Sequence, residues 1–556
     1  MSTLRSALLL SLLGACSFGG PPMQAVNLCA TDAECGPAQC VEARCVSTAT
    51  DPIQVVFRVV PTETTDVRPL WTSESYQVTS PQELDLAVPG YVEVRGQVRF
   101  GEERVAAELV FSRAGLPGLP SVVIRTNTFD EPMVDDEGNE ADYIARLEAG
   151  QAYDVLVRPS VALAEDGDEE PWERRLPPLR VVNQLVTPEP IAGVQSAIWR
   201  AMFPYGEELR DVCGATRTDR CTLQGSVVSM TDMTATAEEG LVVRAIDEEG
   251  TVVSSTSVTD EEGLFTLVIG EASGPYVLRV SAAGARPLFP TIEADPSLLS
   301  EDLRIRVPAV RTVEYEGTVE DAAGGAADAT LEFVSNDVAD EESGLRGSFR
   351  ANVVATEGRF TTTLLPGNYD VTITPTDLSF AVSTESVRIT PSMDDQIIRG
   401  QLFRVERRTQ LGGSVLANTT SEALSDVPVE ARAAVADSTR NRTSESVTDE
   451  TGRFALLLDV GSYDLFMRPG VETGFAWIVA PDLAVGAVDS TLISNYQVTA
   501  PVPVHGMVRD ANDVELAGLE VRAFALSGER YVEVARSRID DDGSYEVLLP
   551  AGFAAP

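Results

Sequence analysis

The stretch TDETGRFALLLDVGSYDLFMRP, residues 448–469, contains the features that decide the fold of this chain. One face of a first strand is expected to hold Phe454, Leu456, Leu458 and Val460, and one face of a second Tyr463, Leu465 and Met467. Alternation with a period of two is typical of a β-strand with one buried face. The preceding D-x-x-G predicts a tight turn, because an Asp carboxylate binds backbone N–H groups two residues on and Gly accepts positive φ.

The same features recur along the chain about every 93 residues, after a longer first interval. The turn glycines are Gly138, Gly263, Gly358, Gly452 and Gly543, of which the first has a looser context. A glycine within an opening strand recurs at Gly96, Gly225, Gly317, Gly413 and Gly506. A tyrosine in a closing strand recurs at Tyr153, Tyr276, Tyr369 and Tyr463, and Phe553 takes its place in the fifth unit. Short strands with frequent turn signals predict a small antiparallel sandwich in each unit.

The fold class that follows is all-β: tandem Ig-like or transthyretin-like antiparallel β-sandwiches, which come after a signal peptide and a small disulfide-rich segment. The predicted sandwiches are 51–182, 222–310, 311–405, 406–500 and an incomplete fifth over 501–556, with a connector over 183–221. Proline-bearing joints such as LDLAVPGYVEVRGQV are expected to limit bending. Five sandwiches of about 30 Å would then form a semi-extended array on the order of 150 Å long. One short helix is expected at AIWRAMF, residues 197–203.

The amino-terminal residues indicate export. The apolar run ALLLSLL, residues 7–13, follows Arg5 and is too short to span a bilayer. Leu13-Gly14-Ala15-Cys16 resembles the lipobox of bacterial lipoproteins. That resemblance implies that residues 1–15 are removed, that Cys16 is acylated and that the membrane is a partner through this anchor. Ser17 in place of aspartate implies the outer membrane or cell surface. The alternative is an ordinary secretory signal near an incidental cysteine.

The other six cysteines are expected to form disulfides. Cys29, Cys35, Cys40 and Cys45 lie within residues 16–50 with the spacing C-x5-C-x4-C-x4-C, which lacks the C-x2-C pairs of zinc sites. Two disulfides would stabilise a segment too short for its own core, and three pairings remain open. A metal site is the alternative. Cys213 and Cys221 are expected to form a third, local bridge.

The order of the motifs resembles carboxypeptidase regulatory-like domains. It runs G-x-V, then strands such as LEVRAFA and VEARAAV, then T-D-x-x-G-x-F, then P-G-x-Y-D-V, over roughly residues 91–556. Those domains are transthyretin-like sandwiches akin to the B-type repeats of Gram-positive adhesins, and they accompany enzymes or act as spacers. The adhesin repeats often carry a lysine–asparagine isopeptide bond. This chain has no lysine, so that bond cannot form.

Composition narrows the functional classes. The formal net charge is −44, which argues against nucleic acid as a partner. His505 is the only histidine, and its isolation argues against hydrolytic or metal chemistry. No catalytic residue, cofactor or metal site is predicted. Calcium at acidic turns such as Asp260–Gly263 and Asp540–Gly543 is an alternative to simple turn chemistry. Trp71, Trp172, Trp199 and Trp477 do not recur at equivalent positions, so they are expected to pack in cores or at their rims, with stacking on sugars as the alternative.

These observations favour a non-enzymatic, membrane-anchored stalk or spacer, either on the cell surface or on the periplasmic face of the outer membrane. An adhesin-like module that binds a glycan or a protein is the alternative. A hydrolase, or a regulatory subunit of one, is the less favoured third hypothesis.

Overall fold

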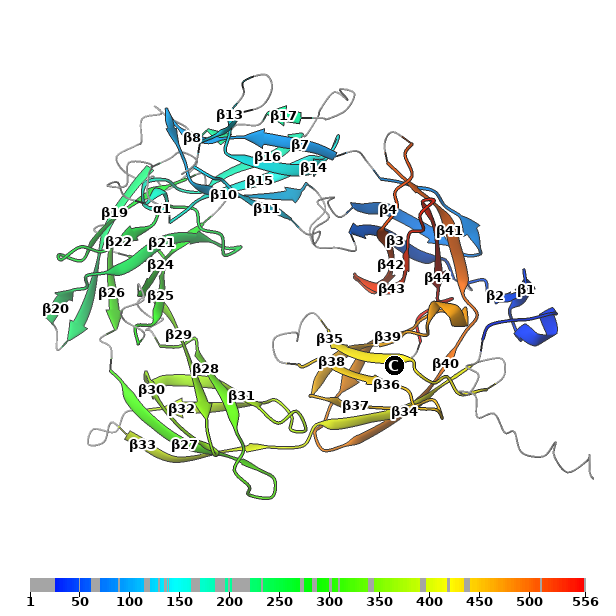
Figure 1. Ribbon diagram of the computed structural model, residues 1–556. Coiled ribbons are helices and arrows are strands. Elements are labelled where there is room, and N and C mark those ends of the chain that lie inside the picture. The colour runs from blue at the N-terminus through cyan, green and yellow to red at the C-terminus, as the bar shows by residue number, and fades with distance from the viewer. Residues whose placement is uncertain are drawn as a thin grey trace, which may run out of the picture.

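A computed structural model of the chain is almost entirely β, which confirms the predicted fold class (Figure 1). The described residues are 26–49, 51–61, 71–88, 91–114, 121–128, 131–134, 138, 140–161, 171–185, 196–198, 201–202, 221–231, 234–270, 275–282, 288–299, 303–308, 311–338, 345–390, 397–417, 421–434, 441–510 and 513–554. They form five modules, and each module is a sandwich of two sheets around its own hydrophobic core.

All five modules share one plan. The first sheet has the opening strand at its centre, with the strand after the acidic turn antiparallel on one side and a parallel strand on the other. The second sheet has four antiparallel strands. Apolar side chains of the two sheets meet between them, as Tyr315 of one sheet and Phe333 of the other do in module 3, with ring centroids 5.8 Å apart.

Modules 1 and 2 come first along the chain. In module 1 the first sheet is β14 (Tyr143–Glu148), β7 (Tyr91–Gly96) and β17 (Ser196–Ile198), and the second is β11 (Val122–Arg125), β10 (Ala107–Arg113), β15 (Ala152–Pro159) and β16 (Leu179–Leu185). Short extra elements are β8 (Val98–Phe100), β9 (Glu103–Arg104), β12 (Met133–Val134), β13 (Glu140–Ala141), β18 (Ala201–Met202) and α1 (Trp172–Arg175). In module 2 the first sheet is β20 (Thr234–Ala237), β19 (Cys221–Thr231), β23 (Leu264–Ile269) and β26 (Arg304–Pro308), and the second is β22 (Ser257–Val258), β21 (Leu241–Asp247), β24 (Tyr276–Ala282) and β25 (Thr291–Ala294).

Modules 3 and 4 repeat the plan with longer strands. In module 3 the sheets are β30 (Arg359–Leu364), β27 (Val313–Asp321) and β33 (Ile397–Val405), and β29 (Leu345–Ala355), β28 (Ala329–Ser335), β31 (Gly367–Pro375) and β32 (Ser383–Ile389). In module 4 they are β37 (Arg453–Leu458), β34 (Thr409–Ala417) and β40 (Thr491–Val498), and β36 (Ser444–Val447), β35 (Pro428–Ala433), β38 (Gly461–Met467) and β39 (Ile478–Val485).

Module 5 is built from both ends of the sequence. The carboxy-terminal part supplies β41 (Val502–Arg509), β42 (Leu519–Ser527), β43 (Arg530–Arg538) and β44 (Ser544–Leu549). The amino-terminal part supplies β3 (Ile53–Pro61), β4 (Trp71–Val78), β5 (Gln82–Glu83) and β6 (Leu86–Ala87). β3 pairs with β42, while β5 and β6 pair with β41.

Two predictions about the ends of the chain are therefore wrong. Residues 53–87 do not belong to the first sandwich, and the fifth sandwich is not an incomplete one over 501–556 alone. Phe553 does not take the place of the closing-strand tyrosine, because β3 occupies the position that β38 has in module 4. Phe553 instead packs at the edge of the module 5 core.

The described parts of the segments between modules contribute strands to the sandwiches. In each module, a strand that follows the sandwich pairs in parallel with the opening strand: β17 with β7, β26 with β19, β33 with β27 and β40 with β34. For module 5 this partner is β5 and β6, which precede module 1 in the sequence. The pattern is thus cyclic. The helix expected at residues 197–203 is also wrong, since β17 and β18 extend into this stretch as strands of module 1.

The five modules form a closed ring (Figure 1). The blue strands β3 and β4 lie beside the orange and red strands of the carboxy-terminal part, so the two ends of the sequence meet in one sandwich. Modules 2 and 3 share a continuous eight-stranded sheet through the pairing of β25 with β29. The expected semi-extended array is therefore wrong: the joints curve the chain, and the amino-terminal strands close it.

Candidate functional site

The ring is closed by the hydrophobic core of module 5, which is well packed. Val55, Phe57 and Val59 of β3 are buried, and they pack with Val521 and Ala523 of β42. Fully burying an aliphatic or aromatic side chain contributes about 1.5–3 kcal/mol each. Several such side chains from each end of the chain contribute to one core, so closure of the ring and folding of module 5 are the same event.

The disulfide-rich segment lies against the joint between modules 4 and 5. It comprises η1 (Asp32–Cys35), β1 (Gln39–Val41) and β2 (Arg44–Val46). Asn27 is buried, donates its backbone N–H to Thr473 O at 2.7 Å, and donates its side-chain amide to Gly474 O at 2.9 Å. Ser47 N–H donates to Pro501 O at 2.8 Å, and Arg44 pairs with Glu546 at 3.1 Å. The segment is therefore docked on the ring.

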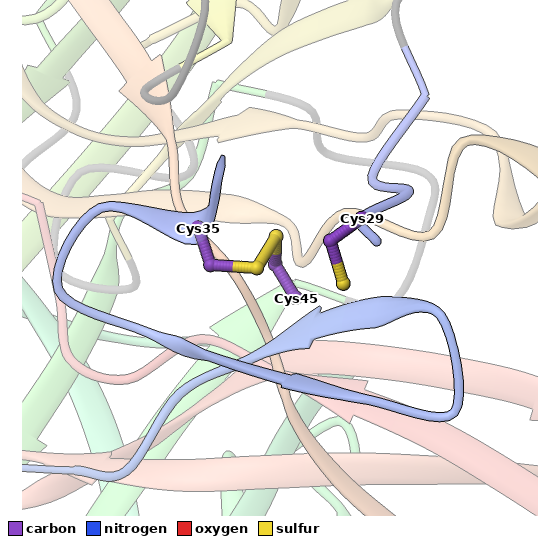
Figure 2. A group of neighbouring side chains, drawn as sticks. All are labelled: Cys29, Cys35 and Cys45. Carbon is purple, nitrogen blue, oxygen red and sulfur yellow. A yellow bond between two sulfur atoms is a disulfide. The ribbon is translucent and has the colours of Figure 1, made fainter. Parts of the chain in front are cut away.

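The pairing of its cysteines is 1–3, 2–4. Cys29 is bonded to Cys40, and Cys35 to Cys45. Figure 2 shows the joined sulfur atoms of Cys35 and Cys45 with Cys29 beside them. The sulfur atoms of Cys29, Cys35 and Cys45 lie within 4.8 Å of one another. All three are consumed in disulfides, so none is a thiolate that could bind a metal.

Of the three other cysteines, two lie outside the described residues. Cys16, the expected lipidation site, and residues 1–15 lie outside them. Cys213 also lies outside them. Cys221, its expected partner, is disulfide-bonded and buried at the start of β19.

The glycine in each opening strand lies beside an aromatic residue of the strand that follows the acidic turn. Gly96, Gly225, Gly317, Gly413 and Gly506 lie directly opposite Tyr143, Phe265, Phe360, Phe454 and Tyr545 across the antiparallel pair. A Cβ at Gly317 would lie 2.6 Å from Phe360 Cζ and 2.7 Å from Gln401 O of the parallel strand. The opening-strand glycine therefore makes room for the ring and for the parallel neighbour, which explains why the two markers recur together.

The acidic turns have a structural role. The five turn glycines have positive φ, between +70° and +84°. Asp449 Oδ1 accepts hydrogen bonds from the N–H groups of Thr451 and Arg453, at 2.8 and 2.9 Å. In the described part of the chain, no set of three acidic side chains gathers its oxygens in the way a calcium site requires. Backbone hydrogen bonding accounts for these acids.

The tyrosines of the closing strands bind the backbone. Tyr153 Oη accepts from Glu148 N–H at 3.1 Å, Tyr369 Oη from Leu365 N–H at 3.1 Å, and Tyr463 Oη from Asp459 N–H at 2.9 Å. Each hydroxyl thereby satisfies a buried N–H four or five residues upstream. The tyrosine marker is a fold determinant.

The remaining predicted candidates have ordinary positions. Trp71, Trp172 and Trp477 are buried, and Trp199 lies outside the described residues. His505 is exposed on β41, opposite Glu546. Burial raises the pKa of Glu148, and the nearby Arg113 opposes that shift. Glu148 pairs with Arg113 at 3.1 Å, which is an internal ion pair of module 1.

A buried ion cluster joins modules 3 and 4. Asp459 accepts from Arg408 Nη2 at 3.2 Å, Arg442 Nη2 at 2.9 Å and Val382 N–H at 3.0 Å. Arg442 also donates to Pro375 O at 3.3 Å across the joint. Burial opposes ionisation of Asp459, but the hydrogen bonds of Arg442 and Val382 and the charge of Arg408 outweigh it and lower its pKa. The cluster fixes the angle between two modules.

Modules 1 and 2 meet at an open pocket of about 950 Å³ that the sequence did not predict. Arg174 and Arg175 of α1 and Phe100 line one side, and Ser255, Thr256, Ser257 and Arg304 of module 2 line the other. Thr256 N–H donates to Glu173 O at 2.7 Å, and Arg244 pairs with Glu173 at 3.3 Å, so α1 is held against module 2. The sequence signal was the Arg174-Arg175 pair shortly after the acidic run EDGDEE, residues 165–170.

No helix in the described part of the chain is long and apolar enough to cross a membrane. No protein-family model matches the chain, and no curated protein does. The resemblance to carboxypeptidase regulatory-like domains therefore stays a resemblance.

The solved structures to which parts of this chain are similar at low identity include two pilins. A streptococcal ancillary pilin has 12% identity and a TM-score of 0.22, over 50% of this chain and 99% of that chain. The Bacillus anthracis TIE protein has 12% identity and a TM-score of 0.18, over 74% of each chain. A minor pilin of Streptococcus agalactiae has 12% identity and a TM-score of 0.23, over 34% of this chain and 96% of that chain. These values are too low to carry a functional argument.

Proposed function

We propose that the chain is a non-enzymatic scaffold on the cell surface, anchored to the outer membrane by a lipid at Cys16. The observation that supports this most is the docking of residues 27–47 on the joint between modules 4 and 5. A tether at Cys16 would reach the ring through residues 17–25, which span at most about 30 Å when extended. The anchor would hold the ring close to the membrane by this sector and direct modules 1 and 2 away from it.

The ring geometry suits a scaffold. Three of its five joints contain a shared sheet, a buried ion cluster or a docked disulfide-rich segment, so the spacing of modules 2 to 5 is fixed. A fixed ring displays several sandwich faces at set angles. The function would lie in position and shape, as it does in spacer domains.

Metabolic labelling with palmitate tests the anchor. Wild-type chain is expected to carry the label and to sediment with membranes. Cys16→Ala should lose both properties, because the acylated thiol is gone, while the matched control Ser17→Ala should keep them. Equal labelling of Cys16→Ala and wild type would refute lipid anchoring.

A further inference from the structure

The pocket between modules 1 and 2 is a cluster of hydrogen-bond donors in an acidic protein. The chain has 42 basic and 86 acidic residues, yet three arginines and one acidic residue, Asp260, line this pocket. Asp260 Oδ1 already accepts from the N–H groups of Glu262 and Leu264, at 3.1 and 2.8 Å. The local balance of charge in the pocket is therefore opposite to that of the whole molecule.

Two of the three arginines are available for a ligand. Arg175 pairs with Glu103 at 3.0 Å and lies over the Trp172 ring at 4.4 Å, so it is held in place. Arg174 and Arg304 are exposed, and neither forms an ion pair with another described residue. A guanidinium without a carboxylate partner presents its N–H donors to whatever enters the pocket.

Three hydroxyl groups add donors of the same kind. Ser255 Oγ accepts from Val268 N–H at 2.9 Å, Ser257 Oγ from Thr266 N–H at 3.2 Å, and Thr256 Oγ1 from Arg244 Nε at 2.8 Å. Toward other described residues, none of the three donates a hydrogen bond. Because their acceptor sides are engaged, their own O–H hydrogens are left to donate. Ser255 and Thr256 are 1% and 5% exposed, so these donors are built into the pocket wall.

We propose that this pocket binds an anionic oligosaccharide. Its carboxylate or sulfate groups would pair with Arg174 and Arg304, and its ring hydroxyls would accept hydrogen bonds from Ser255, Thr256 and Ser257. Charge-assisted hydrogen bonds of this type are about twice as strong as neutral ones. The Phe100 side chain, whose ring centroid lies 5.9 Å from Arg175 Cζ, adds apolar surface to the lining of the pocket. The volume of about 950 Å³ accommodates several sugar units.

The overall negative charge does not exclude an anionic ligand. At physiological ionic strength the screening length is about 8 Å, so distant carboxylates contribute little inside the pocket. The arginines at contact distance dominate there. The proposal does not depend on the lipid anchor, and its failure would leave the scaffold function untouched.

Calorimetric titration of the purified full-length chain tests the proposal. The probes are tetrasaccharides that carry uronic acids, sulfate esters or no charge. At least one charged probe is expected to bind at one site per chain, at least tenfold more tightly than the uncharged probe. Absence of saturable binding by every charged probe, or equal binding of the uncharged one, would overturn the proposal.

Matched charge reversals locate the site. Arg174→Glu combined with Arg304→Glu should weaken binding of the charged probe at least tenfold, with unchanged circular dichroism. Arg346→Glu combined with Arg388→Glu makes the same charge change at two exposed positions of module 3 and should leave binding within twofold. Wild-type affinity in the first pair, or equal losses in both pairs, would contradict the assignment.

Discussion

Gly412 and Gly413 are adjacent in β34 and meet different surroundings. A Cβ at Gly413 would collide with Ser494 O and lie 3.0 Å from two atoms of the Phe454 ring. A Cβ at Gly412 would meet its nearest neighbour, Phe454 O, at 3.9 Å. The repeat therefore requires glycine at the second position only.

This contrast gives a prediction for two single substitutions. Gly413→Ala should destabilise module 4 by roughly 1–3 kcal/mol, because the strand must shift away from its parallel neighbour. Gly412→Ala should be neutral or slightly stabilising, since alanine restricts the unfolded chain. Urea unfolding, monitored by hydrogen exchange in module 4, measures the change in stability for each variant. Similar losses in the two variants would show that the close approach at Gly413 is not what demands glycine.

Asp459 gives a prediction about pH. Its folded-state pKa is lowered, so its contribution to stability is present above the unfolded pKa of about 3.9 and is lost as pH falls through the folded pKa. Asp459→Asn should remove this dependence and cost about 3–5 kcal/mol, since Arg408 stays buried without its counterion. Thermal unfolding between about pH 2 and 7 tests it. A variant whose stability still falls with pH as steeply as wild type would contradict this role.

The sequence predicted each marker residue but not the contacts between markers. The D-x-x-G turns follow from local chemistry that a single hairpin contains. The partner of Gly317 is Phe360 across an antiparallel pair and Gln401 O across a parallel one. Those pairings depend on strand order, which residue periodicity does not specify.

Among the strands, β3 makes the largest difference between expectation and structure. Its residues Val55, Phe57 and Val59 have the same alternation as the closing strands of other modules, and they lie hundreds of residues from their partners in β42. The available signal was the likeness of LDLAVPGYVEVRGQV to the later joints. Each later joint supplies the parallel strand of the module before it. By the same rule, the first joint supplies the parallel strand of module 5, which precedes module 1 on the ring.

A substitution in β3 should therefore be felt at the other end of the chain. Phe57→Ala removes a fully buried ring and should cost about 3–5 kcal/mol in module 5. Hydrogen exchange and proteolysis of residues 519–549 should increase, while modules 2 and 3 stay protected. Gln54→Ala, at an exposed position of the same strand, is the control. Unchanged protection of 519–549 in Phe57→Ala would argue against closure by β3.

At the scale of the whole molecule, solution scattering separates a ring from a stalk. Five modules end to end would extend on the order of 150 Å and scatter as a rod. The ring should give a shorter maximum dimension and no rod-like region in the scattering curve. The fold class was predictable because hydrophobic alternation is local. The curvature was not, because it depends on side-chain contacts between modules, such as Arg442 with Pro375 O.

The cyclic arrangement also sets an order for biogenesis. Strands β3 to β6 leave the ribosome early, but their partners β41 and β42 are synthesised near the other end. Pairings between residues so distant in sequence form late and slowly. Until then Phe57 and its apolar neighbours remain exposed, and the edges of their strand remain unpaired. Both features bind chaperones and promote aggregation. A chain that stops before residue 519 lacks β42 and cannot bury these side chains. Ring closure would therefore distinguish complete chains from truncated ones in cellular quality control.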